Sequence, residues 1–192
     1  MTKTNVKIVT DSTVDIDQSI IEELNIEIVP LSITIDGESY IDRFGIKPDE
    51  FMDKMKHSTE LPKSSQPAVG TFVDVYNRLG EDGSKILSIH MTGGMSGTVG
   101  SAESAAGISD SDVTVIDSRF ISFALSFQVV AAAKMAKQGK GLEEIVKKLS
   151  EIRSNTDLFI MVDTLDNLVK GGRIGRGRSE ERRVGKECPL LC

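Results

Sequence analysis

The sequence is poor in the residues that build disulfide frameworks and metal clusters. Its two cysteines, Cys188 and Cys192, lie at the extreme end of the chain, so the body has neither a disulfide framework nor a thiol nucleophile. The two histidines, His57 and His90, are too few for a metal cluster. We therefore expect a protein without a resident metal and without thiol chemistry.

Long apolar runs are missing as well. Residues 2–5 lead into a strand-like run without the apolar core of a signal peptide, and no stretch approaches the ~20 apolar residues of a membrane span. These absences favour a cytoplasmic protein that makes no stable membrane insertion.

Basic residues are outnumbered by acidic ones. The 23 Lys and Arg residues stand against 29 Asp and Glu residues, which gives a net charge of −6. A protein that clamps a polyphosphate backbone needs a surplus of Lys and Arg, so nucleic acid is not expected as a partner. With 39% apolar residues among 192, the chain can still bury one sizeable core.

The end of the chain differs in character from the rest. Residues 178–188 read RSEERRVGKEC, which resembles the translation of a sequencing-library adapter and has no apolar period. We expect residues 178–192 to be a non-native tail, and a charged, solvated terminal segment is the alternative. The native domain is then expected to cover residues 1–177.

Short apolar runs alternate with helical periods along the body. Strands are predicted at residues 6–12, 26–35, 85–90, 112–118 and 157–163, and Pro30 indicates a bend or an edge position within the second of these runs. Helices are predicted at residues 15–25, 47–58, 72–79, 101–107, 120–138 and 142–152. This alternation predicts an α/β fold in which a layered, mostly parallel sheet is flanked by helices. Residues 61–68 are predicted to form a loop because of their Pro and Ser content.

Three polar segments directly follow predicted strands. They are Asp11-Ser12-Thr13, residues 92–98 (TGGMSGT) and Asp117-Ser118. Because the carboxyl ends of parallel strands share one edge of a sheet, these segments should converge. The 92–98 turn is expected to open a helix with Ser96 as its cap, and free N–H groups there favour a phosphate or a carboxylate. An ordinary Gly-Ser cap is the alternative, and the spacing of a nucleotide-binding loop is absent.

Other polar groups are open to two interpretations. The loop that carries Ser64, Ser65 and Gln66 could bind a ligand or simply cap the next helix. Asp11 and Asp117 could form a catalytic carboxylate pair, although an Asp at a strand end more often accepts N–H bonds from the following turn. We interpret His90 as a packing or orienting residue.

Several short motifs together resemble the DegV family in order and spacing, from about Val6 to Gly175. They are VTDSTVD, IVPLSI, PKSSQPA, SGT, VIDS and VDTLDNLVKGGRIG. The resemblance implies a two-domain, non-catalytic protein that holds a long-chain fatty acid in a tunnel between its domains, without a cofactor. It also implies that the carboxyl group is presented to a separate Dak-type fatty acid kinase, and that the second α/β domain is missing from this chain.

The resemblance assigns roles to individual residues. Ser64 matches the hydroxyl of a Thr-Ser-Gln-Pro motif and Ser96 matches the serine of Ser-Gly-Thr, so both are expected to contact the carboxylate. Arg173 matches an arginine that faces the kinase. Gly93 and Ala68 depart from the family pattern, because each stands where a hydroxyl is frequent. The expected surroundings of the carboxylate are Asp11, Ser12, Thr13, Ser65, Gln66, Thr92, Gly97 and Thr98.

Two other functions are compatible with the same residues. The first is a hydrolase or phosphoryl-handling enzyme that uses Ser96 or the Asp11/Asp117 pair, although no base for the serine is evident from the sequence. The second is a purely structural or regulatory α/β module with an empty pocket. Burial of an acyl chain contributes about 0.8 kcal/mol per CH₂, so a chain that lacks one wall of the tunnel is expected to bind poorly or to aggregate.

Overall fold

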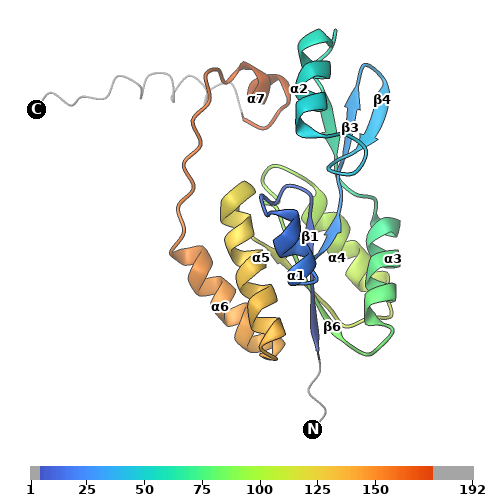
Figure 1. The fold of residues 1–192 in the computed structure, drawn as a ribbon, viewed down its shortest axis with the longest axis vertical. Coiled ribbons are helices and arrows are strands. Elements are labelled where there is room, and N and C mark those ends of the chain that lie inside the picture. Colours follow the sequence, from blue (N-terminus) through green and yellow to red (C-terminus); the bar gives the residue numbers. More distant parts are fainter. Residues whose placement is uncertain (1–4, 175–192) are drawn as a thin grey trace, which may run out of the picture. The chain divides into compact units, whose positions relative to one another are not determined.

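The computed structural model describes residues 5–174 and divides the chain into two compact units, residues 1–158 and residues 159–192 (Figure 1). A four-stranded sheet forms the centre of the first unit. Its strands are β1 (Val6–Asp11), β2 (Glu27–Val29), β6 (Lys85–His90) and β7 (Val113–Asp117), in the order β2-β1-β6-β7. Every pairing in this sheet is parallel, which confirms the predicted fold class.

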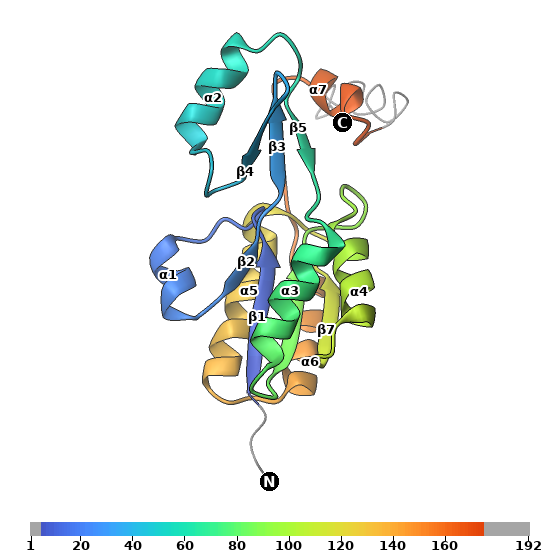
Figure 2. The same cartoon turned by 90° about the vertical axis from the view of Figure 1, so that its right-hand side faces the viewer.

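Helices cover both faces of this sheet, as Figure 2 shows. One face carries α3 (Val69–Gly80) and α4 (Thr98–Ile108), and the other carries α5 (Ser122–Lys137) and α6 (Leu142–Ser154). The short helix α1 (Gln18–Glu23) packs with α5 and α6. Because both faces are covered, the strands have apolar residues on both sides.

The alternation of side chains along the strands divides the core in two. Ile8 and Ile89 pack on the face of α5 and α6, whereas Val9 and Ile86 pack on the face of α3 and α4. On α3 the i, i+4 pair Phe72 and Tyr76 is fully buried against this second face. Polar side chains of β1 and β6 that point to the same face of the sheet as Val9 and Ile86 therefore also lie under α3 and α4.

A second, antiparallel sheet was not predicted. It contains β3 (Ser32–Ile35), β4 (Glu38–Ile41) and β5 (Lys63–Ser65) in the order β4-β3-β5, and the helix α2 (Pro48–His57) follows β4 in the chain. The run 26–35, in which Pro30 indicated a bend or an edge position, is divided at Pro30 into β2 and β3, which belong to different sheets.

Neither the hairpin between β3 and β4 nor the strand β5 was predicted. Asp36 and Gly37 have positive φ angles of 46° and 85° and join β3 to β4, a two-residue hairpin that the Asp-Gly pair indicates. Residues 61–68 were predicted as a loop, but they contain β5, whose residue Ser64 pairs with Ile33. All three residues of β5 are exposed and polar, so no apolar pattern marks the strand.

The second unit is described as far as residue 174. Its helix α7 (Asp166–Lys170) ends at the Gly171-Gly172 pair, and Gly172 has a φ of 71°, as expected for a glycine helix end. The strand predicted at residues 157–163 is wrong, because these residues form no strand. Phe159 and Met161 are 92% and 96% exposed. Residues 178–192, the expected non-native tail, lie outside the described residues.

None of the helices within residues 5–174 has both the length and the apolar content to cross a bilayer.

Candidate functional site

The three polar segments that follow strands meet at one edge of the main sheet. β1, β6 and β7 are neighbours and parallel, so Asp11–Thr13, residues 92–98 and Asp117-Ser118 all leave the sheet on the same side (Figure 2). The chain runs from β1 outward to β2 on one side and returns to β6 on the other. The strand order therefore reverses between β1 and β6, where open α/β sheets bind their ligands.

Asp11 holds the ends of β1 and β6 together. Its Oδ1 accepts hydrogen bonds from Thr13 N (3.0 Å) and Thr13 Oγ1 (2.6 Å), and its Oδ2 accepts from Met91 N (2.9 Å) and contacts His90 Nδ1 at 3.1 Å. Burial raises the pKa of this fully buried carboxyl group, but the hydrogen bonds from His90, Thr13 and Met91 outweigh burial and hold the pKa below 3.8. The carboxylate therefore accepts bonds from both turns.

Ser12 and Thr13 complete this first turn. Ser12 Oγ accepts a hydrogen bond from Leu31 N at 3.0 Å, which attaches the segment after β2 to the turn. Thr13 O accepts from Ser122 N at 3.2 Å, which attaches the start of α5. Both residues lie at the edge where they were predicted, and their hydrogen bonds hold the turn in place.

His90 continues the network from Asp11 into the core. Its Nε2 lies 2.6 Å from Ser88 Oγ, and Tyr76 Oη donates to Ser88 Oγ at 2.8 Å. Ser88, His90 and Asp11 thus share the hydrogen-bond order of a catalytic triad. All three side chains are shielded from solvent, and the Phe72 ring meets the imidazole edge-on at 5.1 Å, so Ser88 cannot reach a substrate.

The turn before α4 directs two hydroxyl groups toward each other. Ser96 Oγ lies 2.8 Å from Thr98 Oγ1 and accepts from Thr98 N at 3.3 Å. The helix begins at Thr98 with Gly97 as its N-cap, so the prediction of Ser96 as the cap was wrong by one position. The Ser96 hydroxyl reaches across two residues to form a local turn. When Thr98 donates both bonds, the Ser96 O–H is left free to donate to a ligand.

Gln66 brings the β5 loop to this turn. A Cβ atom at Gly97 would lie 2.5 Å from Gln66 Nε2, so the amide of Gln66 rests directly on the Gly97 backbone. Ser64 and Ser65, just before Gln66, are exposed at the end of β5. The structure therefore places the 64–66 segment beside the start of α4, and neither serine side chain has a hydrogen-bond partner among the described residues.

This contact predicts different effects for two glycine-to-alanine substitutions. Gly97→Ala should displace the Gln66 amide and weaken the helix cap, whereas Gly100→Ala meets no atom within 4 Å and should stabilise α4 by about 0.5–1 kcal/mol. We expect Gly97→Ala to be the less stable variant by ~1 kcal/mol or more in urea denaturation. Only Gly97→Ala should shift the NMR signals of the Gln66 side-chain amide. Equal stabilities and unshifted Gln66 signals would contradict this contact.

In the loop after β7, Asp117 and Ser118 were predicted at this edge, whereas Arg119 and Phe120 were not. Asp117 Oδ2 accepts from Gly93 N at 3.2 Å and its Oδ1 accepts from Arg119 N at 2.7 Å. Thr92 N donates to Phe120 O at 2.9 Å. Arg119 adopts a left-handed φ of 62°, a conformation that is costly for a non-glycine residue and often occurs at functional sites. Asp117 therefore supports the 92–98 turn, and no sequence pattern indicates the strained backbone of Arg119.

These contacts leave little support for an Asp11/Asp117 catalytic pair. Asp11 is closed off from solvent, and both carboxylates accept hydrogen bonds from the turns that follow strands. The alternative interpretation of a strand-end Asp therefore describes both residues. Arg173 lies in the second unit, where it is exposed and donates from Nη1 to Gly171 O at 2.6 Å. Within residues 5–174 no group of three or more His, Cys, Asp or Glu side chains could hold a metal ion.

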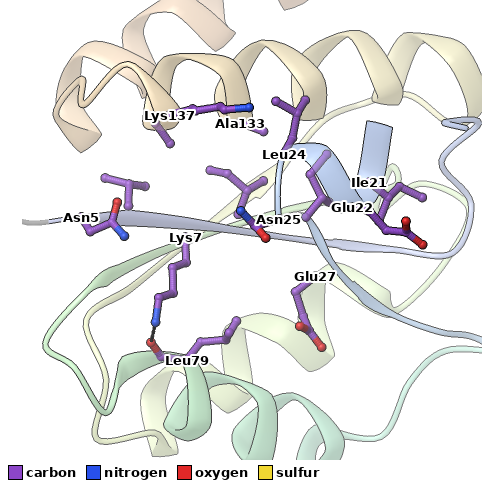
Figure 3. A pocket seen from close by; sticks show the side chains of 14 residues that line it. Asn5, Lys7, Ile21, Glu22, Leu24, Asn25, Glu27, Leu79, Ala133 and Lys137 are labelled. Carbon is purple, nitrogen blue, oxygen red and sulfur yellow. Dashed lines mark hydrogen bonds between the residues drawn. The ribbon is translucent and has the colours of Figure 1, made fainter. Parts of the chain in front are cut away.

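A pocket of about 580 Å³ lies at the opposite edge of the main sheet (Figure 3). Asn5 at the start of β1, Glu27 of β2 and Lys137 at the end of α5 line it. Lys7, also in the lining, donates to Leu79 O at 2.8 Å and to Asp82 at 2.9 Å. Lys137 is likewise paired, with Glu23 at 3.1 Å. Because both lysines are already paired and the pocket faces away from the strand ends, we do not assign the ligand site to this pocket.

The fold and the site together define a class. This is an α/β protein whose strand-end turns form a polar edge lined with hydroxyl groups, at the point where the strand order reverses. A family model described as "Uncharacterised protein, DegV family" matches residues 5–179, and the chain belongs to this family.

Curated relatives and solved structures agree with this assignment. A DegV domain-containing protein of Streptococcus pneumoniae is 49% identical over 173 residues, which cover 90% of this chain and 62% of the relative. A second, from Lactococcus lactis, is 52% identical over 171 residues, with 89% and 61% covered. The chain thus spans less than two thirds of the length of these relatives.

Two solved structures share both fold and sequence with the chain. A DegV family protein of Thermus thermophilus, described as binding fatty acid, has a TM-score of 0.83 and 33% identity. The match covers 98% of this chain and 65% of the Thermus thermophilus chain. DegV of Bacillus subtilis, described as a fatty acid binding protein, has a TM-score of 0.81 and 32% identity, with 95% and 64% covered.

Proposed function

We propose that the protein binds a long-chain fatty acid and holds its carboxylate at the strand-end edge of the main sheet. The observation that carries this proposal is the likeness to the solved proteins of Thermus thermophilus and Bacillus subtilis, which are described as binding fatty acid. A third solved protein, from Eubacterium ventriosum and 30% identical, is described as binding stearic acid. The geometry of the site supports the polar part of this proposal, the binding of a carboxylate.

Hydroxyl groups and backbone amides are the proposed ligands of the carboxylate. A carboxylate that leaves water must regain hydrogen bonds, and hydroxyl donors supply them. Ser96 is the first proposed contact because Thr98 donates to its oxygen and its own O–H can point outward. Ser64 is the second, since Gln66 anchors its loop on Gly97 and the Ser64 side chain stays exposed.

The remaining predicted residues divide into two roles. Asp11, Ser12 and Thr13 hold the first turn through bonds among themselves and to neighbouring strands, so we propose them as supports. Ser65, Gln66, Thr92, Gly97 and Thr98 are proposed to form the surroundings of the carboxylate.

Exposed apolar side chains near the same edge are proposed to contact the acyl chain. Met95, in the 92–98 turn, is 36% exposed, and Phe123 and Phe127, one turn apart on α5, are 62% and 59% exposed. The start of α5 is bonded to Thr13, which places Phe123 close to the carboxylate turns. Each buried CH₂ contributes about 0.8 kcal/mol, so a long acyl chain that covers these rings would supply most of the affinity.

We propose that the protein carries the ligand and performs no catalysis on it, and that a separate fatty acid kinase acts on the presented carboxyl group. The absence of a base at Ser96 supports the first part: in the described residues its hydroxyl is bonded only to Thr98, while His90 is bonded to Asp11 and Ser88. The exposed guanidinium of Arg173 supports a partner contact in the second unit. Incubation with ester and phosphate substrates should release no product.

Ser96→Ala is expected to weaken palmitate binding by about 10- to 100-fold, because a hydrogen bond to a charged group contributes roughly 1.5–3 kcal/mol. The dissociation constant is measured by isothermal titration calorimetry on the wild type and the variant at the same protein concentration. Ser104→Ala is the matched control, since Ser104 is exposed on the same helix and bonds only to Gly100 O. Equal loss of affinity in both variants, or no loss in Ser96→Ala, would count against the proposed contact.

A further inference from the structure

Four buried side chains form a hydrogen-bonded chain that the proposed ligand contacts do not use. It runs from Tyr76 on α3 through Ser88 and His90 on β6 to Asp11 on β1. The consecutive distances are 2.8, 2.6 and 3.1 Å, and each of the four residues is shielded from solvent. The parallel register causes this arrangement, because Thr10 pairs with Ile89 and so places Asp11 beside His90.

The protons of this chain can be assigned from its donors and acceptors. Burial raises the pKa of Tyr76 to about 12, so the phenol stays protonated and donates to Ser88. Ser88 can then donate its own proton to His90 Nε2, and His90 donates its Nδ1–H to the Asp11 carboxylate. In the opposite tautomer a ring lone pair of His90 would face the Asp11 carboxylate. Ser88 would then face two donors, Tyr76 Oη–H and His90 Nε2–H. The arrangement with neutral His90 protonated at Nδ1 is therefore the one in which every proton has an acceptor.

The Asp11 end of this hydrogen-bonded chain lies at the candidate site. Asp11 Oδ2 lies between His90 Nδ1 and Met91 N, and Oδ1 is left for the two donors of Thr13. Met91 directly precedes the 92–98 turn, and Thr13 ends the first turn. A rotation of the carboxylate would therefore move both turns, and the bond from His90 opposes that rotation.

We propose that His90 is a positioning residue of the ligand site: as the neutral Nδ1–H imidazole it orients Asp11, which in turn sets the spacing of the two turns around the ligand. Only the effect of His90 on ligand binding rests on the proposed function. The tautomer and the ordering of the turns stand on the geometry of the buried chain alone.

The first test measures the tautomer in the unmodified protein. The sequence has two histidines, and His57 is exposed on α2, so the ring signals in a long-range ¹H–¹⁵N spectrum can be assigned by a single His57→Gln variant. We expect His90 to be protonated at Nδ1 and not at Nε2 near neutral pH. A ring protonated at Nε2, alone or together with Nδ1, would overturn the proposal.

The second test separates positioning from packing with two substitutions. In His90→Asn the amide nitrogen replaces Nδ1 and can still donate to Asp11, whereas His90→Gln places its amide nearer to Ser88. Both remove the ring that packs against Phe72. We expect the Thr13 and Met91 amides to exchange with solvent at least ~10-fold faster in His90→Gln than in His90→Asn, and palmitate affinity to fall by a similar factor.

Equal exchange rates in the two variants would overturn the proposal, because packing alone would then account for His90. If the wild type binds no palmitate while the two variants still differ at Thr13 and Met91, the proposed function fails and the positioning role stands. Should either variant fail to fold, the tautomer of the wild type still decides the question.

Discussion

Replacement of Asp11 by alanine is expected to lower the free energy of unfolding by about 3–5 kcal/mol, because it leaves several buried donors without an acceptor. This one carboxylate accepts hydrogen bonds from Thr13 N, Thr13 Oγ1, Met91 N and the ring of His90. Urea denaturation followed by circular dichroism measures the loss. Asp74→Ala is the control, since Asp74 is exposed on α3, and it should change stability by no more than ~0.5 kcal/mol.

The same carboxylate predicts the direction of a pH effect. The pKa of Asp11 is lower in the folded protein than the ordinary value of 3.8, so its ionised form stabilises the fold fully above that value. This contribution is lost as the pH falls from 3.8 through the lowered folded pKa. The stability difference between the wild type and Asp11→Asn should therefore narrow below about pH 3.8. A difference that stays constant down to pH 2, or a loss below ~1 kcal/mol for Asp11→Ala, would show that the carboxylate does not hold the two turns.

Phe72→Ala is expected to destabilise the chain by about 3–5 kcal/mol. The ring is 0% exposed, lies 5.7 Å from the Tyr76 ring and meets the His90 ring edge-on, so its removal leaves a cavity next to the buried hydrogen-bonded chain. Phe44→Ala deletes the same ring at a position that is 67% exposed and should change stability by ~0.5 kcal/mol or less. Thermal or urea denaturation of the two variants gives the comparison, and similar losses at both positions would contradict the assignment of Phe72 to the core.

The main sheet could be predicted from the sequence because its strands and helices have regular apolar periods. Phe72 and Tyr76 mark the inner face of α3, and β1 and β6 carry apolar residues on both faces of the sheet. The antiparallel sheet has no such signal. β5 consists of three exposed polar residues, and backbone pairing with β3 alone defines it. Residues 157–163 are the opposite case. They have an apolar composition but form no strand, because no neighbouring strand pairs with them.

The candidate site was predicted in part for a similar reason. The edge where Asp11, Ser96 and Asp117 lie follows from the rule for parallel strands, and the ends of β1, β6 and β7 meet there. The chain through Ser88 and His90 could not be predicted, because it depends on the register between β1 and β6 and on the position of Tyr76 above the sheet. Arg119 escaped prediction because its left-handed backbone leaves no mark in the sequence.

The position of Tyr76 also gives the protein a spectroscopic probe of its own core. The sequence contains no tryptophan and only two tyrosines, so its near-ultraviolet signal comes mainly from Tyr40 and Tyr76. Tyr40 lies on the antiparallel sheet under the ammonium group of Lys54, whereas Tyr76 is sealed against the main sheet with its hydroxyl on Ser88. Near-ultraviolet circular dichroism depends on fixed packing around such rings. With Tyr40→Phe as the background, the remaining tyrosine band reports directly on the buried chain that leads to Asp11.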